Sequence, residues 1–548
     1  MVLPKNAERT KRGRNQSNQE GYQGTCSRER ARTTGHQSVR VTGMKKELTR
    51  KEKISYLVKS LQQMQAVFYK RSDIGSARLF SDVFRQKHRY CQTSRDWYKY
   101  FGGVWTLDAE GLSARADLKL LGEALVQYAS SYEFPDDQEG KKKSEYINYS
   151  LKWLKSAYRG PLLNDAKDLN YISRECMDTD LFTLNCQNGV LNLEGGKVRF
   201  TEHNPDFLLS KITNVSYDPK ATCPRWMQFM DEVTEDPENH QPDQEKKRYL
   251  QKVAGLALVG DCPEHRFFIV FGSSTRNGKS TMTETLLHIM GTYGASVNPE
   301  TLAIQKTDSR RASGDVARLS GIRLAICSEA PRRMPLDSAL LKKLTGGERI
   351  LARHLQEREF EFQPQLTLLM NTNYLPSTTD STIFSSDRVS VCEFNRHFEP
   401  EEQDKHLKQK LIQESSGILN WMISGFQLYL REGLIEPKSI REETQQYKTE
   451  SDRVGTFLTE CLEKTSEPDG CITVKQSYKL YTAWCEESGY PALGKQAFTS
   501  ELRTKRIYKE NFYVKDPLTG KKVTVHRVIA GYTERPLTAE ENPFEIQK

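Results

Sequence analysis

The spacing of apolar residues predicts a strand, a loop and a helix in direct succession within residues 267–293. Five apolar or aromatic residues, Phe267–Phe271, are typical of a buried strand, and the strand ends at Gly272. A polar loop follows. After it, apolar residues recur at helical spacing at Met282, Leu286, Ile289 and Met290.

Upstream of this segment the pattern is mostly helical. From Leu48 to about Leu162 the spacing predicts helices, for example over 54–69 and 117–128. The stretch Trp97–Trp105 mixes aromatic and basic residues, which could stack on bases, but its Gly-Gly pair favours a small hairpin. Residues 180–226 then predict two short strands around Asn188-Gly189, a helix that begins near Pro224, and another helix over 245–259.

Downstream, two further apolar runs predict buried strands, Arg323–Ser328 and Gln365–Met370. Between them the pattern indicates a helix, a break at Gly346-Gly347 and a β-hairpin over 350–362. The charged residues 399–450 predict a helical bridge. The last part of the chain, which begins at 454–462, predicts two helices, over 475–487 and 495–506, and then a hairpin of two strands with a basic tip.

The charge of the chain lies almost entirely at its N-terminus. The net charge is +9, from 81 Lys and Arg against 72 Asp and Glu, and residues 1–53 alone hold 14 basic and 5 acidic residues. Bulk charge therefore does not identify the remainder as a nucleic-acid-binding protein. Residues 1–43 lack apolar periodicity and predict a disordered basic tail, which could contact phosphates, have no specific function, or precede a true start at Met44.

The composition supports neither a membrane-spanning segment nor a structural metal site. No apolar run approaches the roughly 20 residues needed to span a bilayer, and no signal peptide is evident, so we expect a soluble cytoplasmic protein. The eleven cysteines are scattered singly, without zinc-ligand spacing, which favours reduced thiols in cores.

The loop after the first buried strand has the residues of a phosphate-binding loop. In Gly278-Lys279-Ser280-Thr281, the lysine would reach the β- and γ-phosphates of ATP and the Ser280 hydroxyl would bind Mg²⁺. Five residues separate Gly272 from Gly278 where the strict motif has four, so Ser273 stands at the first-glycine position. The predicted nucleotide-binding residues are Gly272, Ser273, Asn277, Gly278, Lys279, Ser280 and Thr281. The alternative is an ordinary turn between a strand and a helix.

Two polar residues at strand ends are candidates for catalysis. Glu329 follows the second buried strand and could orient the attacking water or hold Mg²⁺, although a strand-ending glutamate is often only a solvated residue. Asn373 follows the third strand and could sense the γ-phosphate, although asparagines at strand exits are also common in turns.

Two regions are candidates for DNA binding. The predicted hairpin carries or adjoins Lys343, Arg353, His354 and Arg358, which could grip a phosphate backbone. The C-terminal helices and hairpin suggest a winged helix, with the second helix in the major groove, and the alternative is a module that only packs on the rest. Its DNA-facing residues would be Lys495, Gln496, Thr499, Arg503 and Lys505.

The order of these motifs resembles superfamily 3 helicases of the phage/plasmid and poxvirus primase-helicase type. The resemblance rests on GSSTRNGKST, GIRLAICSEA, LLKKLTGGERILARHL, FEFQPQLTLLMNTNYLP and DRVSVCEFNRHF, and upstream on LFTLNCQNGVLNL, HNPDFLLSK and YDPKATCPRW. It implies a hexameric AAA+-type ring that moves 3′ to 5′ on single-stranded DNA, with ATP between subunits. It also implies that Arg388 is the arginine finger. Two departures are Asp387, where the family has a second arginine, and Glu357 in place of a hairpin-tip lysine.

The sequence thus predicts a multidomain α/β protein: an AAA+-like P-loop ATPase core with an inserted β-hairpin, a helical and mixed N-terminal domain, and a C-terminal winged helix. The predicted boundaries are 1–43 for the tail, 44–245, 246–398 for the ATPase core, 399–450 for the bridge and 451–548.

The predicted function is an ATP-dependent replicative DNA helicase of a phage, prophage or other mobile element in a bacterial host. Single-stranded and forked DNA, further copies of the chain and a separate primase or replication protein would be its partners. One alternative is an origin-binding initiator without processive unwinding. A second is a primase-helicase, for which residues 44–260 contain no convincing pair of metal-binding carboxylates. A packaging or signalling ATPase is disfavoured by the hairpin.

Overall fold

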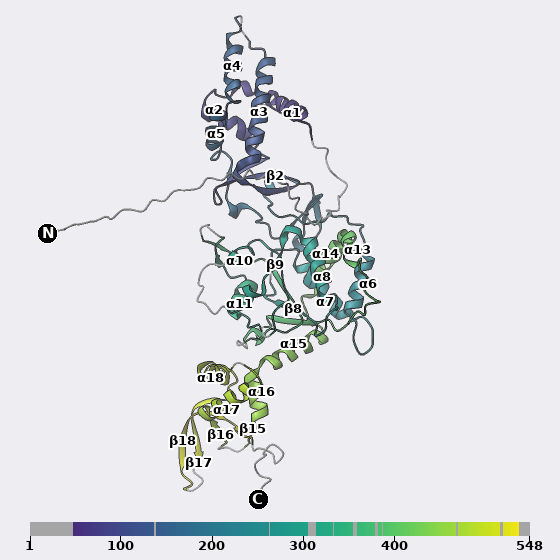
Figure 1. Ribbon diagram of the computed structural model, residues 1–548, viewed down its shortest axis with the longest axis vertical. Helices are drawn as coiled ribbons and strands as arrows, with labels where there is room; N and C mark the ends of the chain where they lie inside the picture. Colours follow the sequence, from purple (N-terminus) through teal and green to yellow (C-terminus); the bar gives the residue numbers. More distant parts are fainter. Residues whose placement is uncertain are drawn as a thin grey trace, which may run out of the picture. The chain divides into compact units, whose positions relative to one another are not determined.

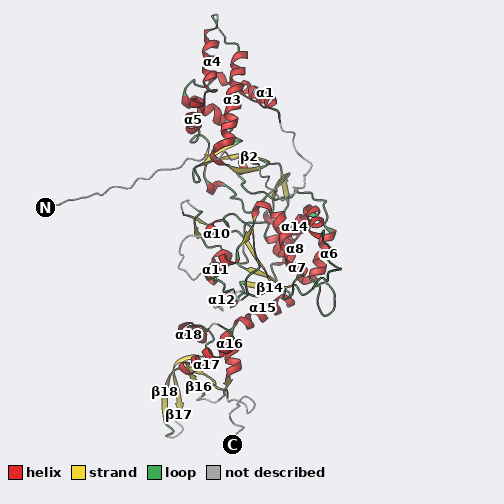
Figure 2. Cartoon of the chain, in the orientation of Figure 1, coloured by secondary structure: helices red, strands yellow, loops and turns green. Residues whose placement is uncertain are grey.

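The computed structural model describes residues 48–535, apart from 136, 138, 262, 305–313, 333, 355–358, 379–381, 386, 467–469, 491 and 516–518. The predicted basic tail 1–43 and the hairpin residue Arg358 lie outside the described residues. None of the helices in the described ranges is both long and apolar enough to cross a membrane. The secondary structure is a mixture of helices and several sheets, as predicted (Figures 1 and 2).

The N-terminal part consists of helices above a small four-stranded sheet with strand order β3-β2-β1-β4. The Gly102-Gly103 pair forms the turn of the predicted hairpin, and both glycines have positive φ angles. Burial of Trp153, Leu121 and Phe80 in one apolar cluster joins the helices. The elements are α1 (Arg50–Gln63), α2 (Asp73–Val83), β1 (His88–Cys91), β2 (Asp96–Phe101), β3 (Val104–Asp108), α3 (Leu112–Ser131), α4 (Lys141–Lys152), α5 (Ser156–Asp165) and β4 (Tyr171–Ile172).

The centre of the chain is a five-stranded parallel sheet with strand order β14-β8-β13-β10-β9. On β8, Phe268 and Val270 belong to one apolar cluster while Phe267 and Ile269 belong to another. Both faces of the sheet are therefore covered, which explains why its strands read as continuous apolar runs. The strands are β8 (Phe267–Phe271), β9 (Gly294–Val297), β10 (Leu324–Ser328), β13 (Thr367–Thr372) and β14 (Val389–Glu393).

Helices lie on both sides of this sheet, with α7, α8 and α14 on one side and α10 and α11 on the other (Figure 1). The predicted hairpin is present as β11 (Ile350–Ala352) and β12 (Phe360–Phe362), which pair antiparallel. The helices are α7 (Gln244–Leu256), α8 (Lys279–Met290), α9 (Pro299–Leu302), α10 (Gly314–Ala317), α11 (Ser338–Gly346) and α12 (Thr382–Ser385).

Residues 184–259 share the apolar cluster of the central sheet, although the sequence assigns most of them to the N-terminal domain. Leu184 and Trp226 are fully buried in this cluster, together with Phe268 of β8. The elements are β5 (Thr183–Cys186), β6 (Gly189–Asn192), β7 (Arg199–Thr201) and α6 (Pro224–Val233), and β5 and β6 form the predicted hairpin around Asn188-Gly189.

The segment predicted as a helical bridge, 399–450, is helical and packs directly on the central sheet before it continues into the C-terminal part. Gly255 of α7 and Gly425 of α14 (Ser415–Glu432) let these helices approach closely: an added Cβ would lie 2.2 Å from Phe426 N and 2.0 Å from Gln251 O. Helix α15 (Lys438–Ser451) covers the edge strand β14, where the Val391 N–H donates to Thr444 Oγ1 at 2.9 Å. The remaining helix is α13 (Leu407–Gln413).

The C-terminal part combines three helices with a three-stranded sheet of order β16-β18-β17. Its core is aromatic and contains Phe457, Tyr481, Trp484 and Phe498. Strands β17 and β18 form the predicted long hairpin (Figure 2). The elements are α16 (Arg453–Cys461), β15 (Leu462–Lys464), β16 (Cys471–Thr473), α17 (Val474–Glu487), α18 (Lys495–Thr504), β17 (Tyr508–Lys515), β18 (Lys522–Ala530) and β19 (Tyr532–Glu534).

Candidate nucleotide site

The loop between β8 and α8 has the backbone geometry that a phosphate requires. Gly278 caps α8 with φ +84°, and a Cβ there would lie 2.5 Å from Val233 Cγ1, so only glycine fits. No side chain caps the first turn of α8. Because the first N–H groups of a helix have no intrahelical acceptor, those at the start of α8 are available to an anion.

Lys279 is the buried cation of this loop. Its Nζ donates to Asn277 Oδ1 at 2.7 Å, to Gly272 O at 3.2 Å and to Ser274 O at 3.4 Å. Burial lowers the pKa of the Lys279 ammonium to about 8. The loop therefore holds the ammonium with neutral acceptors only, which leaves its charge for a phosphate ligand.

This lowered pKa predicts a pH dependence of nucleotide binding. We expect ATP affinity to be highest below about pH 8 and to fall by up to about tenfold per pH unit above it, as free Lys279 deprotonates. The effect on stability has the opposite sign. Between the folded pKa near 8 and the higher unfolded value, the unfolded chain binds more protons, so the free energy of unfolding rises with pH. Nucleotide titrations across this range test the affinity, and Lys279→Arg, which stays charged, should flatten the profile.

Asn277 joins the loop to the segment that follows β14. Its side-chain nitrogen lies 2.8 Å from Ser274 Oγ and 3.0 Å from both Phe394 O and Arg396 O, while its oxygen accepts from Lys279. The residue is 2% exposed. The sequence predicts Asn277 as a nucleotide ligand, but the structure directs its side chain into the protein, where it supports Lys279.

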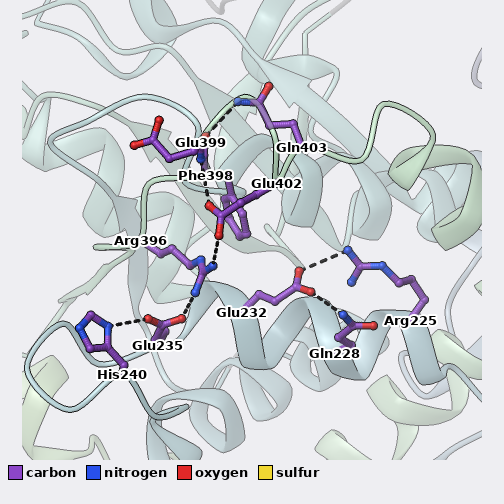
Figure 3. Close-up of polar contacts among 10 residues, drawn as sticks. All are labelled: Arg225, Gln228, Glu232, Glu235, His240, Arg396, Phe398, Glu399, Glu402 and Gln403. Carbon is purple, nitrogen blue, oxygen red and sulfur yellow. Dashed lines mark hydrogen bonds and ion pairs between the residues drawn. The ribbon is translucent and has the colours of Figure 1, made fainter.

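The segment after β14 is itself anchored by ion pairs. Arg396 forms ion pairs with Glu235, beyond the end of α6, and with Glu402, the latter at 2.9 Å (Figure 3). His240 Nδ1 lies 3.0 Å from the same Glu235 carboxylate. The Phe398 N–H donates to Arg276 O at 3.1 Å. The β8–α8 loop is therefore held in place by contacts with residues that are far away in the sequence.

Polar side chains at the end of β13 meet the loop at the carboxyl edge of the sheet. Asn373 Nδ2 donates to Gly272 O at 2.9 Å and to Ser274 O at 2.5 Å. Asn371 Nδ2 donates to Ser280 Oγ at 3.1 Å. The sequence singles out Asn373 rather than Asn371, yet Asn371 is the residue that touches the predicted magnesium ligand.

Glu329 lies at the same edge, directly after β10. Its side chain is exposed, and its N–H donates to Asn371 O at 3.0 Å. Its φ of +60° is unusual for a residue other than glycine, and such strain is found often at functional sites. β10, β13 and β8 are neighbouring parallel strands, so Glu329, Asn371 and the loop share one edge.

These residues fit ATP and Mg²⁺ by their chemistry. Uncapped helix N–H groups and a buried lysine suit phosphates, and the exposed hydroxyl of Ser280 and carboxylate of Glu329 are oxygen donors of the kind Mg²⁺ takes. Within the described ranges, no group of three or more His, Cys, Asp or Glu is arranged as a metal site. Ser273 is exposed on the loop, and Thr281 is half-buried in the first turn of α8.

Arg388 lies at the opposite edge of the sheet from Lys279. It directly precedes β14, and its backbone carbonyl accepts from the Phe267 N–H at 2.7 Å, at the start of β8. Its guanidinium lies 3.3 Å from Thr345 Oγ1 and 3.4 Å from Lys342 O, near the end of α11. Within one chain, Arg388 is therefore not part of the nucleotide site.

The described hairpin residues lie on exposed surface near β11. Lys343 is exposed on α11 and Arg353 is exposed directly after β11. His354 stacks on Phe360 of β12, with ring centroids 5.3 Å apart. The hairpin thus presents Arg353 outward while His354 contributes to its packing.

The C-terminal candidates divide into two groups. Lys495, Gln496, Thr499 and Arg503 line a groove between α18 and the β17–β18 hairpin, together with His526 and Arg527. Arg503 lies over the Tyr508 ring at 4.7 Å. Lys505, by contrast, forms an ion pair with Asp452 at the N-terminus of α16, so it does not belong to the predicted DNA-facing surface.

Comparisons with known proteins find three family models that match separate parts of the chain. Residues 77–235 match the family "D5 N terminal like", residues 449–526 match "Poxvirus D5 protein-like", and residues 270–388 match a family of unknown function. The outer two matches confirm the resemblance to primase-helicases of the poxvirus type and superfamily 3.

The individual relatives are distant and longer than this chain. "Putative helicase L207/L206" of Acanthamoeba polyphaga mimivirus is 24% identical over 71% of this chain and 43% of its own length. "Putative primase C962R" of African swine fever virus (isolate Tick/Malawi/Lil 20-1/1983) is 19% identical over 62% of this chain and 38% of its own. The chain thus spans about half or less of the curated relatives it matches. They are viral proteins, and they leave the predicted bacterial host untested.

Among solved structures, the apo C-terminal region of NrS-1 covers 63% of this chain and 95% of its own, with 11% identity and a TM-score of 0.36. No conclusion about the fold rests on a match at that level.

Proposed function

We propose that this protein is an ATP-dependent DNA helicase of viral or mobile-element replication, with a P-loop ATPase core of the AAA+ type and a C-terminal winged helix. The observation that carries the proposal is the meeting of Lys279, Ser280 and Glu329 at the carboxyl edge of one parallel sheet. In open α/β sheets, ligands bind at this edge. The strand order, with β8 between β14 and β13, supports a P-loop core of this type.

Within this site, each residue has a separate task. Lys279 and the N-terminus of α8 would hold the β- and γ-phosphates, and Ser280 and Glu329 would hold Mg²⁺, directly or through water. Asn371 would orient the Ser280 hydroxyl, and Asn373 would keep the loop carbonyls turned away from the phosphates. Arg388, at the far edge of the sheet, could act as a finger only on the nucleotide of a neighbouring copy, so the proposal includes a ring, with six copies by resemblance.

For the motor to unwind DNA, a DNA contact must move with the nucleotide state. The hairpin β11–β12 follows α11 and precedes β13, which carries Asn371 and is followed directly by Asn373. Arg353 on this hairpin is exposed and available for a phosphate. We propose that nucleotide-dependent movement of this hairpin carries one DNA strand.

The groove beside α18 favours a second candidate, an initiator that assembles on a specific duplex without processive unwinding. A helix with Lys495, Gln496, Thr499 and Arg503 on one face carries side chains that read base edges as well as phosphates. This candidate and the helicase share the ATPase, so only strand separation distinguishes them.

The test is unwinding of a forked DNA with one labelled strand, with ATP or with a non-hydrolysable analogue, by the wild type and by Arg353→Ala. We expect release of the strand with ATP only, from forks with a 3′ loading tail. Arg353→Ala should retain ATPase activity measured without DNA, but should lose most of its unwinding. Lys438→Ala, an exposed lysine of α15 paired with Glu442, is the control and should unwind normally.

Each outcome separates the candidates. Release of the strand with the analogue would contradict an ATP-driven motor. Absence of release, together with tight binding to one duplex sequence, would favour the initiator. Equal loss of ATPase and unwinding in Arg353→Ala would contradict the DNA-gripping role of the hairpin.

A further inference from the structure

The N-terminal part contains a basic groove that the sequence does not reveal. It has a volume of about 710 Å³ and lies between the β1–β2 turn, the start of α3 and helix α5. Five basic side chains line it against two acidic ones, Asp96 and Glu110. The basic residues are Arg95, Arg115, Lys119, Arg159 and Lys167. We call this the N-terminal groove.

Three of these cations have no structural task within the described residues. Arg95, Arg115 and Lys119 are exposed, and none of their side chains forms an ion pair or hydrogen bond in the part of the chain that the structure describes. The other two are anchored. Arg159 donates to Leu154 O at 2.5 Å, and the Lys167 ammonium lies 5.1 Å from the Tyr90 ring centroid.

The arrangement of the three cations carries an energetic cost. Arg115 and Lys119 are four residues apart on α3, where like charges face each other and destabilise a helix by a few tenths of a kcal/mol. Arg115 lies at the end of the first turn of α3, where the helix dipole disfavours a cation. Arg95 and Glu110, on the rim, have φ angles of +58° and +55°, in the region that favours glycine. Costs of this kind are found where a surface serves a ligand.

A glycine leaves the wall of the groove open. Gly160 is in the interior of α5 and lines the groove, and an added Cβ would meet nothing within 4 Å. Contacts with the rest of the chain therefore do not require glycine there, whereas Pro161, the next residue within α5, disfavours a Cβ in the helical conformation at this position. Its effect is to leave room for a ligand beside the cations.

We propose that the N-terminal groove binds single-stranded DNA through its phosphates. The groove offers exposed cations on the β1–β2 turn and on α3, with the anchored Arg159 and Lys167 beside them, a pattern that suits a chain of phosphates more than one small anion. Arg115 and Lys119 lie about 6 Å apart along the axis of α3. This distance is close to two intervals of about 3.4 Å between neighbouring charges on one DNA strand. The groove would hold a strand of the fork outside the motor. This extends the proposed function without requiring ATP hydrolysis.

The test is the binding of a labelled oligothymidylate without nucleotide, over a range of salt concentrations. The double variant Arg115→Glu/Lys119→Glu is compared with Lys141→Glu/Lys142→Glu, which makes the same charge change at an exposed helix start of the same part. Because the hairpin and α18 are also proposed to bind DNA, all proteins carry Arg353→Ala and Arg503→Ala. Loss of two phosphate contacts should weaken binding by about 10- to 30-fold near 0.1 M salt and reduce the salt slope by about 1.4.

A second variant separates charge from shape. Gly160→Leu adds bulk to the groove without a charge change, so weaker binding with an intact fold would support occupation of the groove. Circular dichroism checks the fold of every variant. Unchanged affinity in both groove variants, or an equal loss in the Lys141/Lys142 control, would overturn the proposal. Because no ATP is present, a failed helicase assay leaves this result unaffected.

Discussion

ATP hydrolysis is expected to fall by at least about 10²- to 10³-fold when Lys279 is replaced by alanine, because a preorganised donor to the reacting phosphate is removed from a buried site. Lys279 is the buried cation that the β8–α8 loop holds with the carbonyls of Gly272 and Ser274 and with Asn277. Steady-state ATPase assays at saturating DNA measure the loss, and the same variant should release no strand from a fork.

The matched control for this variant is Lys408→Ala. Lys408 is also a lysine in contact with α8, through an exposed ion pair with Glu284 at 2.6 Å. Exposed pairs contribute little to stability, so this variant should keep near-normal activity. ATPase activity in Lys279→Ala within a fewfold of the control would contradict the assignment of this loop to ATP.

The elements that depend on local pattern were predicted well. The strand Phe267–Phe271, helix α8 and the two hairpins that turn at Gly102-Gly103 and Asn188-Gly189 were all confirmed. In these cases the chain carries the signal itself, either as a buried strand next to an amphipathic helix or as residues that tolerate positive φ.

Long-range packing was not visible in the sequence. The segment 399–450 reads as a charged bridge, but α14 presses on α7 through Gly255 and Gly425, and α15 covers β14. Each of these contacts joins residues more than 50 positions apart, and no local period records such a partner. A glycine within each of two helices was the available signal, because close helix approach needs small residues.

The candidate site was predicted by residue type more reliably than by role. Lys279 and Ser280 lie where the loop pattern puts them, at the start of a helix after a buried strand. Asn371 and Asn373 both contact the β8–α8 loop, Asn371 through Ser280 Oγ and Asn373 through two loop carbonyls. Alternation along a strand places both on one face and does not tell which of them reaches Ser280.

Replacement of Asn277 is the second prediction with a large expected effect. Asn277→Ala removes the donor to Phe394 O and Arg396 O and the acceptor of Lys279, all at a residue that is 2% exposed. A buried group left without its partner costs about 1–3 kcal/mol, so the free energy of unfolding should fall by about 2–4 kcal/mol. Displacement of the lysine should also reduce ATPase activity by about tenfold or more. Denaturant unfolding and ATPase kinetics measure the two effects.

Asn277→Asp distinguishes the two roles of Asn277, namely its hydrogen bonds to Phe394 O and Arg396 O and its hydrogen bond with Lys279. A carboxylate keeps the shape and still accepts from Lys279, but it cannot donate to the two carbonyls, so stability should fall as in the alanine variant. Its negative charge should raise the pKa of Lys279 and move the decline of ATP affinity to higher pH, whereas the alanine variant should show no such upward shift. Unchanged stability in both variants would contradict a brace between the loop and the segment after β14. If the aspartate variant loses stability but the decline of its ATP affinity does not move to higher pH, Asn277 stabilises the fold without controlling the pKa of Lys279.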